Sequence, residues 1–119
     1  MIVGSVTSAG EPVVPVTIHG QARRIRIAAI LDTGFTGELC LARRHRRTMK
    51  LERLGEAEAE LADGSRITQA VYAGRVTFDG ELRRVLVTLT NSEDSLLGTA
   101  MLRRKRLAID FCSGRVTVR

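Results

Sequence analysis

The stretch Leu31-Asp32-Thr33-Gly34-Phe35-Thr36-Gly37 decides how this chain is interpreted. It follows an extended segment, 23–31, in which isoleucines alternate with arginines before the sequence becomes continuously apolar from Ala28. A strand that turns fully apolar is entering a core, so Asp32 stands where the chain leaves that core. Aspartate and glycine are also ordinary turn residues. The stretch is therefore either a plain turn between strands or a turn that presents a carboxylate for chemistry.

Outside this stretch the chain shows many short extended segments and little helix. Apolar residues alternate or cluster in short runs, and these predict strands over 13–18, 57–61, 67–71, 76–78, 82–89, 107–111 and 116–118. Asp79-Gly80 predicts a tight hairpin, because both central residues of a type I′ turn need a positive φ. Helices are expected only over 41–51 and 99–105. The pattern predicts a mostly β fold and a single domain over residues 1–119.

The charge of the chain is positive and concentrated. It has 19 lysines and arginines against 13 acidic residues, a net charge of +6, with basic runs at 43–47 and 103–106. Such runs can attract nucleic acid, but aromatic residues that stack on bases are few and none lies inside either run. A solvated face is the favoured interpretation. No apolar run is long enough to span a membrane and no signal peptide is evident, so a cytoplasmic protein is expected.

The cysteines and histidines point to no special chemistry. Cys40 and Cys112 are expected to be small buried hydrophobes rather than a disulfide pair. Neither His19 nor His45 has a partner at metal-ligand spacing, so neither a metal nor another cofactor is implied.

Three features, in this order along the chain, resemble the retropepsin-like aspartic peptidases of the pepsin clan. They are Leu31-Asp32-Thr33-Gly34, a glycine-tipped hairpin about thirty residues later, and Leu96-Leu97-Gly98 before a short helix. The form Asp-Thr-Gly-Phe-Thr-Gly in so short a chain resembles the small single-domain prokaryotic members. The resemblance covers roughly residues 12–111. It implies an all-β, closed β-barrel fold with one or two short helices.

The resemblance also implies a reaction, the hydrolysis of peptide bonds in a polypeptide substrate. In such enzymes two carboxylates share one proton, because like charges that close cannot both be ionised, and together they activate a water. This chain has only one Asp-Thr-Gly, and no other aspartate follows an apolar strand into Thr-Gly. The second carboxylate is therefore expected from a second copy of Asp32 across the two-fold axis of a homodimer.

The resemblance assigns roles around Asp32. The Thr33 hydroxyl is expected to hydrogen-bond the partner loop, and Gly34 to bring a backbone N–H close to the carboxylate. Leu97 and Gly98 are expected to pack beneath the loop. The hairpin tip Ala62-Asp63-Gly64-Ser65 is expected to act as a flap over the substrate.

Phe35 departs from the pattern of the family, which usually has a small residue after the catalytic glycine. Its ring is expected to narrow the cleft or to fill a substrate subsite. Two alternatives to a general peptidase are therefore considered. One is a constricted retropepsin-like module that binds peptides or processes itself; the other, less favoured, is a basic protein that binds nucleic acid.

Overall fold

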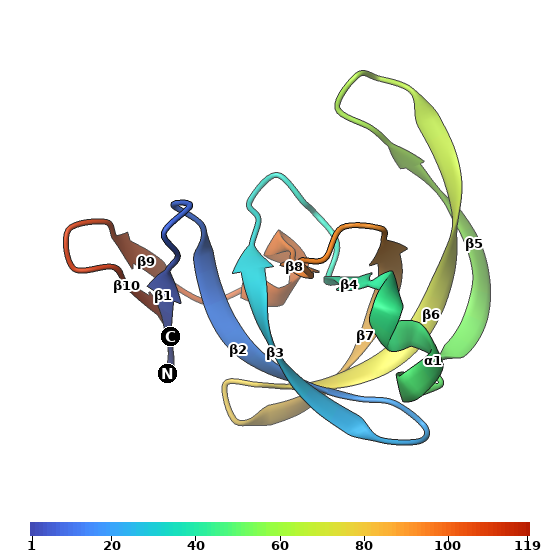
Figure 1. Cartoon of the computed structure of the whole chain (residues 1–119), viewed down its shortest axis with the longest axis horizontal. Coiled ribbons are helices and arrows are strands. Elements are labelled where there is room, and N and C mark those ends of the chain that lie inside the picture. The colour runs from blue at the N-terminus through green and yellow to red at the C-terminus, as the bar shows by residue number, and fades with distance from the viewer.

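Ten strands make up most of this computed structural model, which describes residues 1–119 (Figure 1). The predicted all-β class is confirmed. The strands are β1 Ile2–Val6, β2 Pro12–His19, β3 Arg24–Leu31, β4 Leu39–Ala42, β5 Glu52–Glu60, β6 Arg66–Phe78, β7 Glu81–Thr90, β8 Leu96–Leu97, β9 Leu107–Asp110 and β10 Arg115–Val118. The helical segments are two 3₁₀ helices, η1 Arg43–His45 and η2 Thr99–Leu102, and the single turn α1 Arg46–Met49.

The strands form one sheet in the order β5-β6-β7-β4-β8-β3-β2-β1-β10-β9. Strand β6 also pairs with β2, so the pairings run in a ring through β2, β3, β8, β4, β7 and β6. The expected closed barrel is represented by this ring, while β5 and β9 remain as free edges of the sheet order. Most pairings are antiparallel, but β3 with β8 and β4 with β7 are parallel.

The core lies on one face of these strands and follows from their alternation. In β2, Val14, Val16 and Ile18 are buried. In β3 the arginines of the first half are exposed, and burial becomes complete at Ala29 and Leu31, as the increasingly apolar sequence predicts. Side chains at alternate positions point to opposite faces of a sheet, so in β2 every second residue from Val14 is buried, and in the first half of β3 the exposed arginines alternate with half-buried isoleucines.

The two central hairpins share a strand, which the sequence did not suggest. Segments 67–71 and 76–78 were expected as separate strands, but β6 runs without a break from Arg66 to Phe78. Its first part pairs with β5 and its second part with β7. The turn at Asp79-Gly80 is confirmed, since both residues have positive φ, at 52° and 78°.

The helix expected over 41–51 is largely wrong. Leu39–Ala42 is strand β4, held between β7 and β8, and only residues 43–49 are helical. These long-range pairings outweigh the local preference of the segment for helix. The second expected helix, 99–105, is shorter too, because it consists only of η2 at Thr99–Leu102.

The cysteines are both free. Cys40 is half-buried, and burial raises the pKa of its thiol. Cys112 is exposed, which corrects the expectation that it is a buried hydrophobe. No helix in the chain is both long and apolar enough to cross a membrane.

Candidate active site

The loop that carries Asp32 leaves the sheet at the end of β3. There β3 pairs in parallel with the two-residue strand β8, with Leu31 beside Leu97. The Asp32 N–H donates to the Leu97 carbonyl at 3.0 Å, and the Phe35 N–H donates back to the Asp32 carbonyl at 3.1 Å. A buried strand therefore anchors one side of the turn, and a backbone hydrogen bond closes it.

The Asp32 carboxylate is half-buried and faces the turn that follows it. Its Oδ1 accepts a hydrogen bond from the Gly34 N–H at 2.9 Å. A Cβ on Gly34 would lie only 3.2 Å from the same oxygen. Gly34 therefore lies close against the Asp32 carboxylate.

Leu97 and Gly98 are in backbone contact with this loop. The Gly98 N–H donates to the Glu38 carbonyl at 2.9 Å, and the Thr99 N–H donates to the Phe35 carbonyl at 2.9 Å. A Cβ on Gly98 would overlap the Gly37 carbonyl oxygen. The contact between the two backbones is so close that no side chain fits between them.

The ring of Phe35 packs against its own loop. A Cβ on Gly37 would lie 2.6 Å from the ring Cζ, and a Cβ on Gly98 would lie 2.8 Å from the ring Cδ2. The ring therefore rests on the two glycines that bring the loop and η2 together. Its suggested contact with substrate stays a prediction.

Thr33 has a different environment from its neighbours in the loop. It is exposed, and its hydroxyl makes no hydrogen bond within the chain. A hydroxyl that is free in one copy is available to a second copy, as the dimer hypothesis requires.

The tip of the β5–β6 hairpin rises on the same side of the molecule as the Asp32 loop (Figure 1). Ala62, Asp63, Gly64 and Ser65 are exposed, and Gly64 has a φ of +86°. The Asp63 Oδ1 accepts hydrogen bonds from the Ser65 hydroxyl at 2.6 Å and the Ser65 N–H at 2.9 Å. These bonds hold the pKa of Asp63 below its usual value. The predicted flap is thus a well-formed turn on exposed strands.

The sequence interpretation missed Ser95, which hydrogen-bonds both strands that flank the Asp32 loop, β3 and β4. Its side chain is only 4% exposed, and its Oγ accepts the Ala42 N–H at 2.9 Å. Its carbonyl accepts the Ile30 N–H at 2.9 Å. In the sequence, only its position immediately before Leu96-Leu97-Gly98 could have indicated this role.

Part of the first basic run holds the segment that leads into Ser95. The Arg43 Nε donates to the Asn91 Oδ1 at 2.9 Å. An Arg44 guanidinium N–H donates to the Glu93 carbonyl at 2.6 Å. The sequence suggested only a solvated face for this run, because contacts across about fifty residues leave no local pattern.

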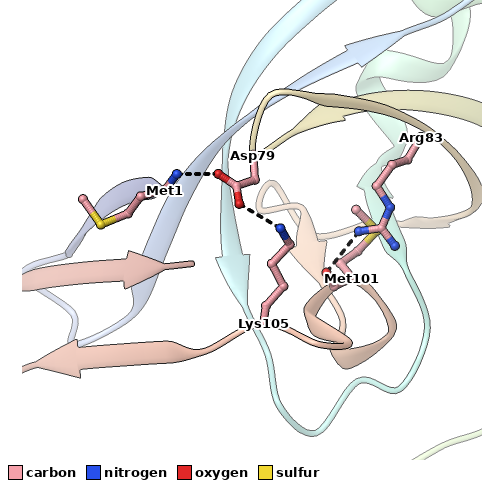
Figure 2. Close-up of polar contacts among 5 residues, drawn as sticks. All are labelled: Met1, Asp79, Arg83, Met101 and Lys105. Atoms are coloured by element: carbon pink, nitrogen blue, oxygen red, sulfur yellow. Dashed lines mark hydrogen bonds and ion pairs between the residues drawn. The ribbon is translucent and has the colours of Figure 1, made fainter.

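Polar contacts join the β6–β7 hairpin to the N-terminus, to η2 and to Lys105 just after η2 (Figure 2). Asp79 binds Lys105 Nζ at 2.7 Å and the Met1 amino group at 2.6 Å. The hydrogen bond from Lys105, followed by that from the amino group, lowers the pKa of Asp79 to about 2. Arg83 donates to the Met101 carbonyl at 3.2 Å and so holds η2, which begins just after Gly98.

No cluster of three or more His, Cys, Asp or Glu side chains is arranged to hold a metal ion. The loop over residues 32–38 carries the carboxylates of Asp32 and Glu38, the hydroxyls of Thr33 and Thr36, and backbone amides; Glu38 is engaged by the Leu86 N–H. They can orient a carboxylate toward solvent or toward a second molecule.

Comparison with solved structures identifies the fold. A retropepsin-like aspartic protease from Rickettsia conorii matches over 98% of this chain and 87% of its own, with a TM-score of 0.64 and 16% identity. The chain has a retropepsin-like fold. The EIAV protease complexed with the inhibitor HBY-793 is also similar in structure. It matches over 79% of this chain and 86% of its own, with a TM-score of 0.61 and 16% identity.

The simian foamy virus (mac) protease matches more loosely. It covers 75% of this chain and 91% of its own, at a TM-score of 0.52 and 16% identity. No protein-family model and no curated protein matches the chain. At these identities the comparisons establish an aspartic protease fold and leave the activity to be tested.

Proposed function

We propose that this retropepsin-like chain is a homodimeric aspartic endopeptidase with Asp32 as its catalytic residue. The observation that carries the proposal is the Asp32 carboxylate, which is held by Gly34 N–H at the end of a buried strand while staying partly open to solvent. The retropepsin-like fold of the whole chain supports the same interpretation.

The dimer follows from the number of carboxylates the reaction needs. Three other aspartates are engaged elsewhere: Asp63 with Ser65, Asp79 with Lys105, and Asp110 with the backbone of Cys112. None of them has the Asp-Thr-Gly setting. A second copy of Asp32 across a two-fold axis supplies the missing partner, and the exposed Thr33 is available to join the two loops.

In the proposed mechanism the two Asp32 carboxylates share one proton. The ionised member takes a proton from a water held between them, and this water attacks the peptide carbonyl. The protonated member donates toward the carbonyl oxygen, so acid and base roles belong to one coupled pair. The β5–β6 hairpin would close over the extended substrate, with Ala62, Asp63, Gly64 and Ser65 at its tip.

The test is peptide release from an unfolded protein mixture, measured from acid to neutral pH. Wild type, Asp32→Asn and Asp94→Asn are compared, the last being a matched change at an exposed carboxylate that accepts no hydrogen bond. We expect cleavage by wild type and Asp94→Asn and none by Asp32→Asn, while all three sediment as the same dimer. Cleavage by Asp32→Asn, or a protein that stays monomeric while cleaving, would contradict the proposal.

The same assay, applied to Phe35→Ala, tests whether the Phe35 ring limits substrate choice. The ring packs on Gly37 and Gly98, so Phe35→Ala opens space beside the carboxylate. If the ring also limits substrate choice, the variant cleaves at a wider range of sites. A folded dimer that cleaves nothing, with or without Phe35, would instead favour a peptide-binding module.

A further inference from the structure

Four basic side chains lie side by side across four neighbouring strands. In the antiparallel register Arg24 of β3 is opposite His19 of β2, and His19 is opposite Arg75 of β6. Arg75 in turn is opposite Arg84 of β7. Directly opposed residues of antiparallel strands project from the same face of the sheet. We call these four residues the cationic row; it lies within neither basic run of the sequence.

The cationic row is on the outer face of the sheet. The neighbouring residues on β2 and β6, Ile18 and Val76, point inward and are fully buried. The three arginines of the row are exposed. None of them makes a salt bridge or a side-chain hydrogen bond, whereas the His19 Nε2 contacts the Thr77 hydroxyl at 2.9 Å. Arg75 and Arg84 are directly opposed arginines, and like charges in this position destabilise a sheet, so an anion bound between them would relieve a repulsion.

A cavity of about 470 Å³ opens beside the row. His19, Arg75 and Arg84 line it together with the apolar side chains of Leu54 and Leu86. These leucines are 53% and 54% exposed, so their apolar side chains are accessible to a ligand. The site therefore offers positive charge and apolar contact together.

Two carboxylates also line this cavity, next to the row. Glu38 accepts the Leu86 N–H at 2.9 Å and is thus already engaged. Glu52 is opposite Ala73, two residues along β6 from Arg75, or about 7 Å at the rise of a strand. Neither pairs with an arginine of the row.

The length of the row indicates the size of its ligand. Three gaps between strands, each about 4.8 Å, give a row about 14 Å long. An extended peptide advances about 3.3 Å per residue, so four to five residues span the row. Carboxylates of such a segment can form charge-assisted hydrogen bonds with the guanidinium groups, and its apolar side chains can contact Leu54 and Leu86.

Other ligands fit less well. Single-stranded nucleic acid is bound chiefly by bases stacking on aromatic side chains, and no Phe, Tyr or Trp lines this cavity. A second copy of the chain carries the same row and a net charge of +6, so the two faces repel. We infer that the cationic row is a docking site for an acidic segment of a partner protein, in which apolar residues accompany the carboxylates.

The basic side chains of the row lie away from the Asp32 carboxylate, although the cavity beside them reaches Glu38, the last residue of the Asp32 loop. The β2–β3 and β6–β7 hairpins lie at the opposite side of the molecule from the Asp32 loop and the β5–β6 tip (Figure 1). A segment docked on the row therefore leaves Asp32 free. The inference stands independently of the proposed peptidase activity.

The test uses Asp32→Asn protein, so that the probe cannot be cleaved through Asp32. The probe is a fluorescein-labelled dodecapeptide with four consecutive glutamates flanked by leucines, and a peptide with glutamines in their place is the control. Binding is followed by fluorescence anisotropy at low salt and at about 0.15 M salt. We compare R75E/R84E with R103E/R106E, which changes the net charge equally at exposed arginines of the second basic run.

We expect the acidic peptide to bind at least about tenfold more weakly to R75E/R84E and within about twofold of the parent for R103E/R106E. Equal weakening by both pairs, or no binding to the parent, would overturn the inference. Tighter binding of a deoxythymidine dodecamer that is lost in R75E/R84E would assign the row to nucleic acid instead. Should circular dichroism show that R75E/R84E is unfolded, R75Q/R84Q is judged by the same criteria.

Discussion

The carbonyl oxygen of Gly37 occupies the place where a side chain on Gly98 would begin. That carbonyl also accepts the Ala100 N–H at 3.2 Å, and the Phe35 ring covers the same spot. The Asp32 loop and η2 are thus in direct backbone contact. The position of the carboxylate depends on this contact because nothing flexible lies between the two segments.

Gly98→Ala should therefore destabilise the protein. The added methyl group must push the Gly37 carbonyl away, and overpacking of this kind costs about 1–3 kcal/mol. Chemical denaturation measures the free energy of unfolding, with Thr99→Ala as a control that adds no atoms at the next position. Equal stability of Gly98→Ala and wild type would show that the backbones can separate freely.

Ser95→Ala should lower the free energy of unfolding by about 1–3 kcal/mol, because it leaves the buried Ala42 N–H without an acceptor. Ser92→Ala makes the same chemical change at an exposed serine, whose Oγ accepts the Asp94 N–H at 3.2 Å. Its effect should be smaller, since water can replace the lost acceptor. Denaturation curves of the two variants measure both free energies of unfolding. A larger loss of stability in Ser92→Ala than in Ser95→Ala would contradict the prediction.

Asp79→Asn should remove an acid-sensitive part of the stability. The folded-state pKa of about 2 lies below the usual unfolded value of about 3.9. The charged form thus stabilises the fold above the unfolded value, and this contribution is lost as the pH falls through about 2. The stability difference between wild type and Asp79→Asn should accordingly shrink from pH 5 to pH 2. Denaturant titrations at several pH values measure it, with Asp94→Asn as control. A difference that does not change with pH would argue against the Lys105 pairing.

Thr33→Val should weaken the proposed dimer without unfolding the chain. The hydroxyl is exposed in one copy, so its loss is tolerated there, but each unpaired partner at a buried interface costs about 1–3 kcal/mol. The dimer dissociation constant should rise by at least about tenfold. Sedimentation velocity over a range of concentrations measures this, with Thr36→Val as the matched change at another exposed threonine. An unchanged dissociation constant would place Thr33 outside the interface.

Local patterns were sufficient for much of the fold and for the centre of the site. Alternating residues predicted β2 and β3, the Asp79-Gly80 turn has the expected positive φ values, and Asp32 follows a buried strand. These features depend on neighbours within a few residues, so the sequence contains them directly. The helix expected over 41–51 failed because Leu39–Ala42 is held by strands from residues 81–97, which no local pattern reveals.

The sequence by itself determined the extended segments β2 and β3, the tight turn at Asp79-Gly80 and which carboxylate follows the buried strand. It could do so because strand alternation and turn chemistry are properties of adjacent residues. Only the tertiary structure decided which residues from distant parts of the chain contact those segments. It bonded Ser95 to Ile30 and Ala42 and packed Gly98 against the Asp32 loop, and it aligned Arg24, His19, Arg75 and Arg84 from distant parts of the chain. Such contacts depend on the register between strands, which is fixed by packing of the whole core.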